Sequence, residues 1–64
     1  MVNVKEIMTK NPVAVDANTI VREAIQIMSE KKLGSVLVRQ GKDIVGILEE
    51  SAIVQNVLAK DLNL

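Results

Sequence analysis

The chain has no cysteine, no histidine and no aromatic residue among its 64 residues. The first two absences exclude disulfides and the thiolate or imidazole ligands of most structural zinc sites. They also exclude Ser/His/Asp and Cys/His catalytic arrangements, and no glycine-rich phosphate loop is present, so the sequence does not predict an enzyme. Without aromatic side chains there is no platform on which bases stack, and the net charge is zero, with eight basic and eight acidic residues. Nucleic-acid binding is therefore not expected.

Long apolar runs are also missing. None approaches the roughly 18 residues that a membrane helix requires, and the first residues do not follow the pattern of a signal peptide. We therefore expect a cytoplasmic protein with no membrane partner.

Aliphatic residues are what the chain has in abundance. Hydrophobic residues make up 48% of the sequence and the mean hydropathy is +0.25. A domain of this length buries only about 60% of its unfolded surface, and such domains usually depend on disulfides, metals or oligomerisation. Since the sequence excludes the first two, it predicts apolar surface left over for a second copy of the chain.

The central stretch of the chain predicts a β-hairpin. Residues 35–38 and 44–48 are apolar strands, and residues 39–43 form a polar loop in which Gly41 supplies a positive φ. Neither strand alternates cleanly, so we expect both faces of the hairpin to be covered.

The residues before the hairpin predict a short strand and a helix. Pro12 ends an irregular stretch and biases Asn11 toward an extended conformation; residues 13–15 then form a strand. Thr19 is the expected N-cap of a helix over residues 20–32, and Gly34 is placed to terminate it. The apolar positions of this helix follow helical spacing: Ile20, Val21, Ala24, Ile25, Ile27 and Met28.

The two ends of the chain are less regular. Residues 2–8 predict one helical turn or an irregular lead-in that packs against the body of the domain. Residues 49–60 predict a second helix, capped by Glu49 or Ser51, and residues 61–64 are expected to fray. The apolar stripe of this second helix consists of Ile53, Val54, Val57 and Leu58.

Two small groups of residues allow more than one interpretation. Glu49 and Glu50 are either a pair that binds a metal or takes part in catalysis, or solvated acids at the start of a helix. We expect the solvated acids, because neighbouring helical residues point about 100° apart and do not converge on one ion. The methionines are an adaptable ligand surface or simple core filler, and we expect core filler for Met8 and Met28.

In this order and spacing, the segments resemble the CBS domain family, named for cystathionine β-synthase. The resemblance covers about residues 4–59 and is carried by residues 7–9, 11–15, 22–28, 33–38 and 41–48. It implies a single domain over residues 1–64, an α+β fold of two layers in the order strand, helix, strand, strand, helix. It also implies that the chain is half of a Bateman module, in which two such units pair sheet against sheet, here as a homodimer.

The resemblance further implies a regulatory role with an adenosine-containing ligand such as AMP, ADP, ATP, S-adenosylmethionine or NAD, and no required cofactor. Backbone groups near the starts of the first strand and of the hairpin would hold the base, and a motif after the hairpin would hold ribose and phosphate. Gly34 and Ser35 are then either a notch for adenine or only a helix stop followed by a strand. Carried onto this chain, the site residues are Lys10, Pro12, Val13, Leu33, Gly34, Ser35, Val36, Glu49 and Ala52.

The last two of these positions depart from the family pattern. Glu49 replaces the Thr or Ser that bonds a phosphate, and Ala52 replaces the Asp that accepts from the ribose hydroxyls. Like charges about 4 Å apart cost roughly 4 kcal/mol at an effective dielectric of 20, and a lost polar contact costs about 1–3 kcal/mol. The sequence thus predicts a dimerising regulatory domain whose nucleotide binding is weak or absent. The alternative is a pure association module with no ligand.

Overall fold

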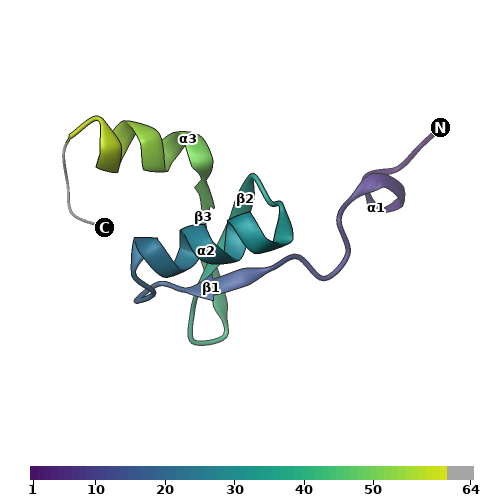
Figure 1. Cartoon of the computed structure of the whole chain (residues 1–64). Helices are drawn as coiled ribbons and strands as arrows, with labels where there is room; N and C mark the ends of the chain where they lie inside the picture. Colours follow the sequence, from purple (N-terminus) through teal and green to yellow (C-terminus); the bar gives the residue numbers. More distant parts are fainter. Residues whose placement is uncertain (61–64) are drawn as a thin grey trace.

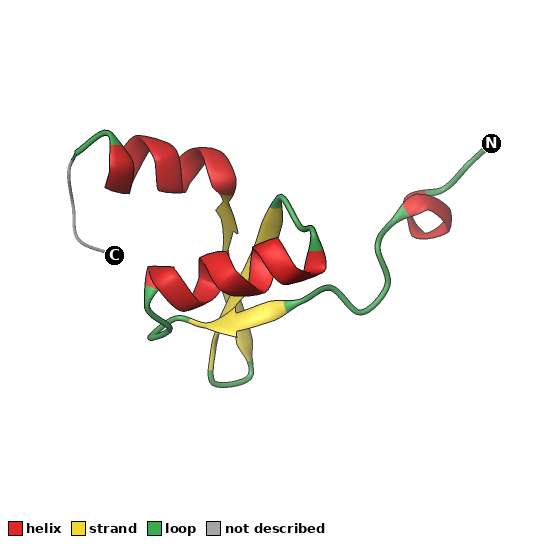
Figure 2. Ribbon diagram, in the orientation of Figure 1, coloured by secondary structure: helices red, strands yellow, loops and turns green. Residues whose placement is uncertain are grey.

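The computed structural model describes residues 1–60 and consists of a three-stranded sheet with helices packed on one face (Figures 1 and 2). The strand order is β1-β2-β3, with β1 parallel and β3 antiparallel to β2. The α+β class and the predicted element order are confirmed; the predicted fraying of residues 61–64 lies outside the described residues. The elements are α1 (Val4–Ile7), β1 (Ala14–Asp16), α2 (Val21–Lys31), β2 (Ser35–Gln40), β3 (Asp43–Glu49), α3 (Glu50–Ile53) and the π-helix η1 (Val54–Leu58).

The core lies between the sheet and the helices α2 and α3. Val15, Met28, Val36 and Ile53 form one buried cluster, and Ala24 of α2 is also buried. All five side chains are aliphatic or thioether groups, as the absence of aromatic residues requires. The prediction that Met28 fills the core is confirmed.

The opposite side of the sheet has no helix on it among the described residues. Cross-strand partners point to the same side of a sheet, and Leu37 is the partner of both Ala14 and Ile47. Because Val15 and Val36 point into the core, this alternate row points away from it. We call the surface around Ala14, Leu37 and Ile47 the open face. Ile47 is 57% exposed and Ile44, nearer the hairpin turn, is 55% exposed, so the prediction that both faces are covered is wrong for this chain alone.

The hairpin turn is tighter than the predicted five-residue loop. Gln40 pairs with Asp43 and Arg39 with Ile44, so only Gly41 and Lys42 remain in the turn. Gly41 has a φ of 63°, as predicted. The register shifts between Val38 and Arg39, which marks a β-bulge.

The start of α2 differs from the prediction that Thr19 is its N-cap. The carboxylate of Asp16 accepts a hydrogen bond from the Asn18 N–H at 2.9 Å, and the Asp16 carbonyl accepts from the Thr19 N–H at 2.9 Å. This turn occupies Thr19, so the helix begins one residue later than predicted. Ile20 is the N-cap and makes no side-chain capping bond. The first strand is also displaced by one residue, since β1 includes Asp16 instead of Val13.

The end of α2 is set by Lys32, which corrects the prediction that Gly34 terminates the helix. Lys32 has the left-handed backbone angles φ 55° and ψ 49°. The Leu33 N–H donates to the Met28 carbonyl at 2.8 Å and the Lys32 N–H to the Ser29 carbonyl at 3.3 Å. These are the two bonds of a Schellman motif, which satisfy the last carbonyls of the helix.

The predicted second helix is present but changes its winding after one turn. The Ala59 N–H donates to the Val54 carbonyl at 2.9 Å, a bond of π-helical spacing. The Asn56 side-chain amide donates to the Ala52 carbonyl at 2.9 Å, the acceptor that an α-helix would offer to the Asn56 backbone. Of the two predicted caps, Glu49 is the N-cap of α3, although its side chain makes no capping bond, and Ser51 lies inside the helix. Of the predicted stripe, Ile53 is buried and Val57 half-buried, whereas Val54 and Leu58 are exposed.

The lead-in forms the predicted helical turn, α1, but does not pack against the body of the domain. Met8 is 52% exposed, so the prediction that it fills the core is wrong. Asn11 has a φ of 51° instead of the extended conformation predicted before Pro12; asparagine tolerates this left-handed region better than most residues. Figure 1 shows α1 standing away from the sheet and the other helices.

Candidate binding pocket

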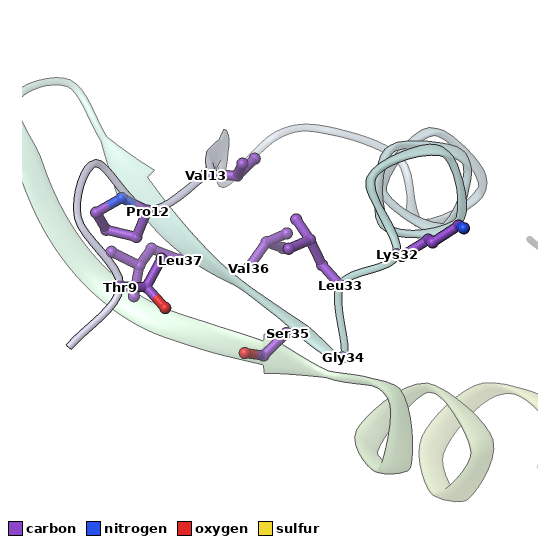
Figure 3. A pocket seen from close by; sticks show the side chains of 9 residues that line it. All are labelled: Thr9, Pro12, Val13, Lys32, Leu33, Gly34, Ser35, Val36 and Leu37. Carbon is purple, nitrogen blue, oxygen red and sulfur yellow. The ribbon is translucent and has the colours of Figure 1, made fainter. Parts of the chain in front are cut away.

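A pocket of about 310 Å³ opens where the lead-in to β1 passes the start of β2 (Figure 3). This volume is at the lower end of the range of small-molecule pockets. Residues from both sides of the crossover helix α2 line it: Thr9, Pro12, Val13, Lys32, Leu33, Gly34, Ser35, Val36 and Leu37.

Backbone hydrogen bonds join the three segments that meet at the pocket. The Leu37 N–H donates to the Val13 carbonyl at 2.9 Å, which ties the lead-in to β2. The Glu50 N–H donates to the Gly34 carbonyl at 3.1 Å, which ties the start of α3 to the start of β2. The pocket rim is therefore fixed by main-chain contacts that depend on the fold more than on side-chain identity.

The walls of the pocket combine apolar side chains with polar groups. Its side-chain polar groups are the hydroxyls of Thr9 and Ser35 and the ammonium of Lys32, and in Figure 3 the Lys32 side chain points away from Pro12 and Val36. No atom comes within 4 Å of a β-carbon built on Gly34, so this position is open. Such mixed walls suit a small group that has both apolar surface and polar atoms.

Acidic side chains are the other candidates for a functional site among residues 1–60. No three His, Cys, Asp or Glu side chains gather in a metal-binding cluster among residues 1–60. The solvated interpretation of Glu49 and Glu50 agrees with their exposure.

Six of the nine residues named from the sequence line this one pocket. They come from segments twenty residues apart, which the parallel pairing of β1 and β2 brings together. The other three, Lys10, Glu49 and Ala52, do not line it. The six are Pro12, Val13, Leu33, Gly34, Ser35 and Val36.

Glu49 nevertheless lies beside the pocket. It is the cross-strand partner of Ser35, and side chains of directly opposed residues have β-carbons roughly 5 Å apart. Ala52 is half-buried on α3, where its carbonyl accepts from the Asn56 side chain. Lys10 is exposed on the lead-in.

Sequence reasoning missed three lining residues. Strand alternation could have identified Leu37 as a lining residue, because it lies on the same side of β2 as Ser35. Lys32 lines the pocket because it adopts the left-handed end of α2, and no sequence signal favours a lysine there. The position of Thr9 in the pocket depends on the path that the lead-in takes past β2.

Comparison with known proteins identifies the family of this fold. A family model described as "CBS domain" matches residues 4–59. The chain belongs to the CBS domain family. The single α+β domain seen here is thus one CBS domain, and the resemblance inferred from the sequence is confirmed.

Three solved structures resemble this CBS domain. A cystathionine beta-synthase domain protein fused to a Zn-ribbon-like domain is 33% identical with a TM-score of 0.77, covering 80% of this chain and 73% of that one. A conserved CBS domain protein of unknown function from Thermoplasma acidophilum is 30% identical with a TM-score of 0.89, covering 97% and 35%. An uncharacterized conserved protein from Pyrococcus horikoshii is 33% identical with a TM-score of 0.86, covering 94% and 46%.

This CBS domain therefore spans less than half the length of the two archaeal proteins. A search of the curated proteins finds no match. Within residues 1–60, no helix has both the length and the apolar character needed to cross a bilayer.

Proposed function

We propose that the chain is a regulatory CBS domain that works as a pair, a Bateman-like module built from two copies, and that it has no catalytic activity of its own. The observation that carries this proposal is the open face of the sheet. Ile47 and Ile44 are both more than half exposed there, on strands whose other side forms the core. Burying an aliphatic side chain of this size stabilises an assembly by about 1.5–3 kcal/mol.

The small core supports the same proposal. Only five hydrophobic residues of the chain as described are buried, in a domain without disulfides. Domains of this size commonly obtain the rest of their stability from a partner subunit.

Sedimentation velocity of the unmodified chain tests the pairing. Between about 1 and 100 micromolar, a range typical of moderately tight protein pairs, we expect a dimer that dissociates on dilution. A well-folded single particle throughout this range would overturn the proposal.

For the ligand, we propose that the pocket accepts the adenosine portion of AMP, ATP or S-adenosylmethionine weakly or not at all. Glu49 is the cross-strand partner of Ser35 at the pocket edge, so a carboxylate stands where the family resemblance expects a phosphate-binding hydroxyl. Repulsion between such charges costs roughly 4 kcal/mol at about 4 Å and an effective dielectric of 20. Ala52 offers no side-chain acceptor to a ribose.

Restoring the two family residues tests this explanation. The double variant Glu49→Thr/Ala52→Asp is expected to gain a thermal shift with millimolar AMP, because saturation at 100 times the dissociation constant adds about 2.7 kcal/mol. Glu50→Thr, which removes a neighbouring acid outside the family motif, is the matched control and should gain none. A large shift of the unmodified chain with AMP would contradict the proposal.

The alternative is a pure association module. The outward direction of the Lys32 side chain favours it, because the ammonium group is turned away from the pocket (Figure 3). In that case neither the unmodified chain nor the double variant shifts with AMP, ATP or S-adenosylmethionine, while the dimer persists.

A further inference from the structure

The Glu49 carboxylate stands at the edge of the binding pocket, beside Ser35. The two residues are cross-strand partners, so their side chains lie on the same side of the sheet. Glu49 is exposed and makes no capping bond to α3. Its carboxylate is therefore available to a molecule that enters the pocket.

The cation among the lining residues, Lys32, is directed elsewhere. The N–H groups of Lys32 and Leu33 bond to carbonyls of the last turn of α2, which fixes the backbone from which the lysine side chain leaves. In Figure 3 the Lys32 side chain and the Ser35 hydroxyl point in opposite directions. A phosphate beside Ser35 would therefore meet the Glu49 carboxylate without a compensating ammonium group.

The polar groups that remain at the pocket match a positively charged donor. The rim carbonyls of Val13 and Gly34 already accept backbone N–H groups. The hydroxyls of Thr9 and Ser35 can donate or accept, whereas an ionised carboxylate such as that of Glu49 only accepts. A charged donor suits this set best, because a hydrogen bond between ionised groups is roughly twice as strong as a neutral one.

We infer that this pocket selects small organic cations, in which a protonated amine is joined to a body with both apolar surface and polar atoms. The amine lies at Glu49 and the body lies against the mixed walls. A volume of about 310 Å³ suits a small body. The inference rests on the proposed function, since it names the charge of the ligand that the same pocket accepts and the phosphate esters that it rejects.

Three ligands that share the adenosine body and differ in charge test the inference. At neutral pH 5′-amino-5′-deoxyadenosine is a cation, adenosine is neutral and AMP is an anion. Each is titrated into the unmodified chain at low salt and followed by NMR chemical shifts. We expect the affinity to fall in this order, with the amine bound about tenfold more tightly than AMP, because the carboxylate attracts one and repels the other. The difference should shrink as sodium chloride is added, since salt screens exposed charges.

The variant Glu49→Gln keeps the size and polarity of the side chain and removes its charge, so it should make the three affinities nearly equal. Glu50→Gln is the matched control and should leave the order intact, because Glu50 lines a separate cavity of about 190 Å³ between α2 and α3. An unchanged order in the Glu49 variant would overturn the inference. So would AMP binding to the unmodified chain as tightly as the amine.

The outcomes separate this inference from the proposed function. If none of the three ligands binds while sedimentation shows the dimer, the inference fails and the pure association module stands. If AMP binds most tightly and with a large thermal shift, both the inference and the proposed weakness of nucleotide binding fail. If the chain is a monomer that prefers the amine through Glu49, the pairing fails and the inference stands.

Discussion

Lys32 occupies a backbone conformation that glycine adopts far more easily. Its φ of 55° and ψ of 49° place it in the left-handed region, where the β-carbon of an L-residue crowds the following carbonyl. The helix nevertheless ends there, because the Leu33 and Lys32 N–H groups find the Met28 and Ser29 carbonyls. The two hydrogen bonds offset the strain of the lysine and set the direction in which the chain enters the pocket.

Replacing this lysine by glycine is expected to stabilise the domain. Lys32→Gly relieves the left-handed strain and should raise the free energy of unfolding by up to about 1 kcal/mol. Lys31→Gly, one residue earlier inside α2, should lower it by about 1 kcal/mol, because glycine is a poor helix former. Urea denaturation of both variants at one protein concentration checks the opposite signs; loss of stability in both would contradict this account of the helix end.

The elements differ in how firmly they are held. β2 is paired on both sides, with β1 and with β3, and Val36 near its start is buried. α3 is held through Ile53 in the core and the bond from Glu50 to Gly34, while Val54 and Leu58 of η1 are exposed. The C-terminal helices are therefore attached through one buried side chain, Ile53, and the half-buried Val57 that packs against the core.

Ile53→Ala should accordingly loosen α3 and η1. Truncating a buried isoleucine to alanine costs about 2–5 kcal/mol, and we expect hydrogen exchange to accelerate first in residues 50–58. Val54→Ala, at the exposed next residue, which begins η1, is the control and should change protection little. Uniform loss of protection through β2 in the Ile53 variant would show that the helix and the sheet open as one unit.

Within residues 1–60, two apolar surfaces are exposed: the lead-in, residues 1–10, and the open face of the sheet. Neither contributes to the core, so substitutions there should affect association more than folding. Mass action then makes the melting temperature depend on protein concentration, because a partner that binds only the folded state stabilises it.

We expect the melting temperature of the unmodified chain to rise with concentration. Ile47→Ser on the open face should abolish most of this dependence. Val54→Ser, an equally exposed apolar position on η1, should leave the dependence intact. Scanning calorimetry at several concentrations measures both, and a concentration-independent melting temperature of the unmodified chain would contradict the pairing.

Local sequence rules were sufficient for the element order, for Gly41 in the turn and for Met28 in the core, because each depends on periodicity or on the backbone preference of one residue. They failed where neighbours compete for the same backbone groups: Asp16 displaces the predicted Thr19 cap, and Asn56 takes the carbonyl that an α-helix would need. Six of the pocket residues were named from the family resemblance, while Lys32 was not. Its place in the pocket depends on a left-handed helix end that lysine does not favour. The exposure of Ile47 and of the lead-in, residues 1–10, followed only from the packing, since alternation cannot say which side of a sheet receives the helices.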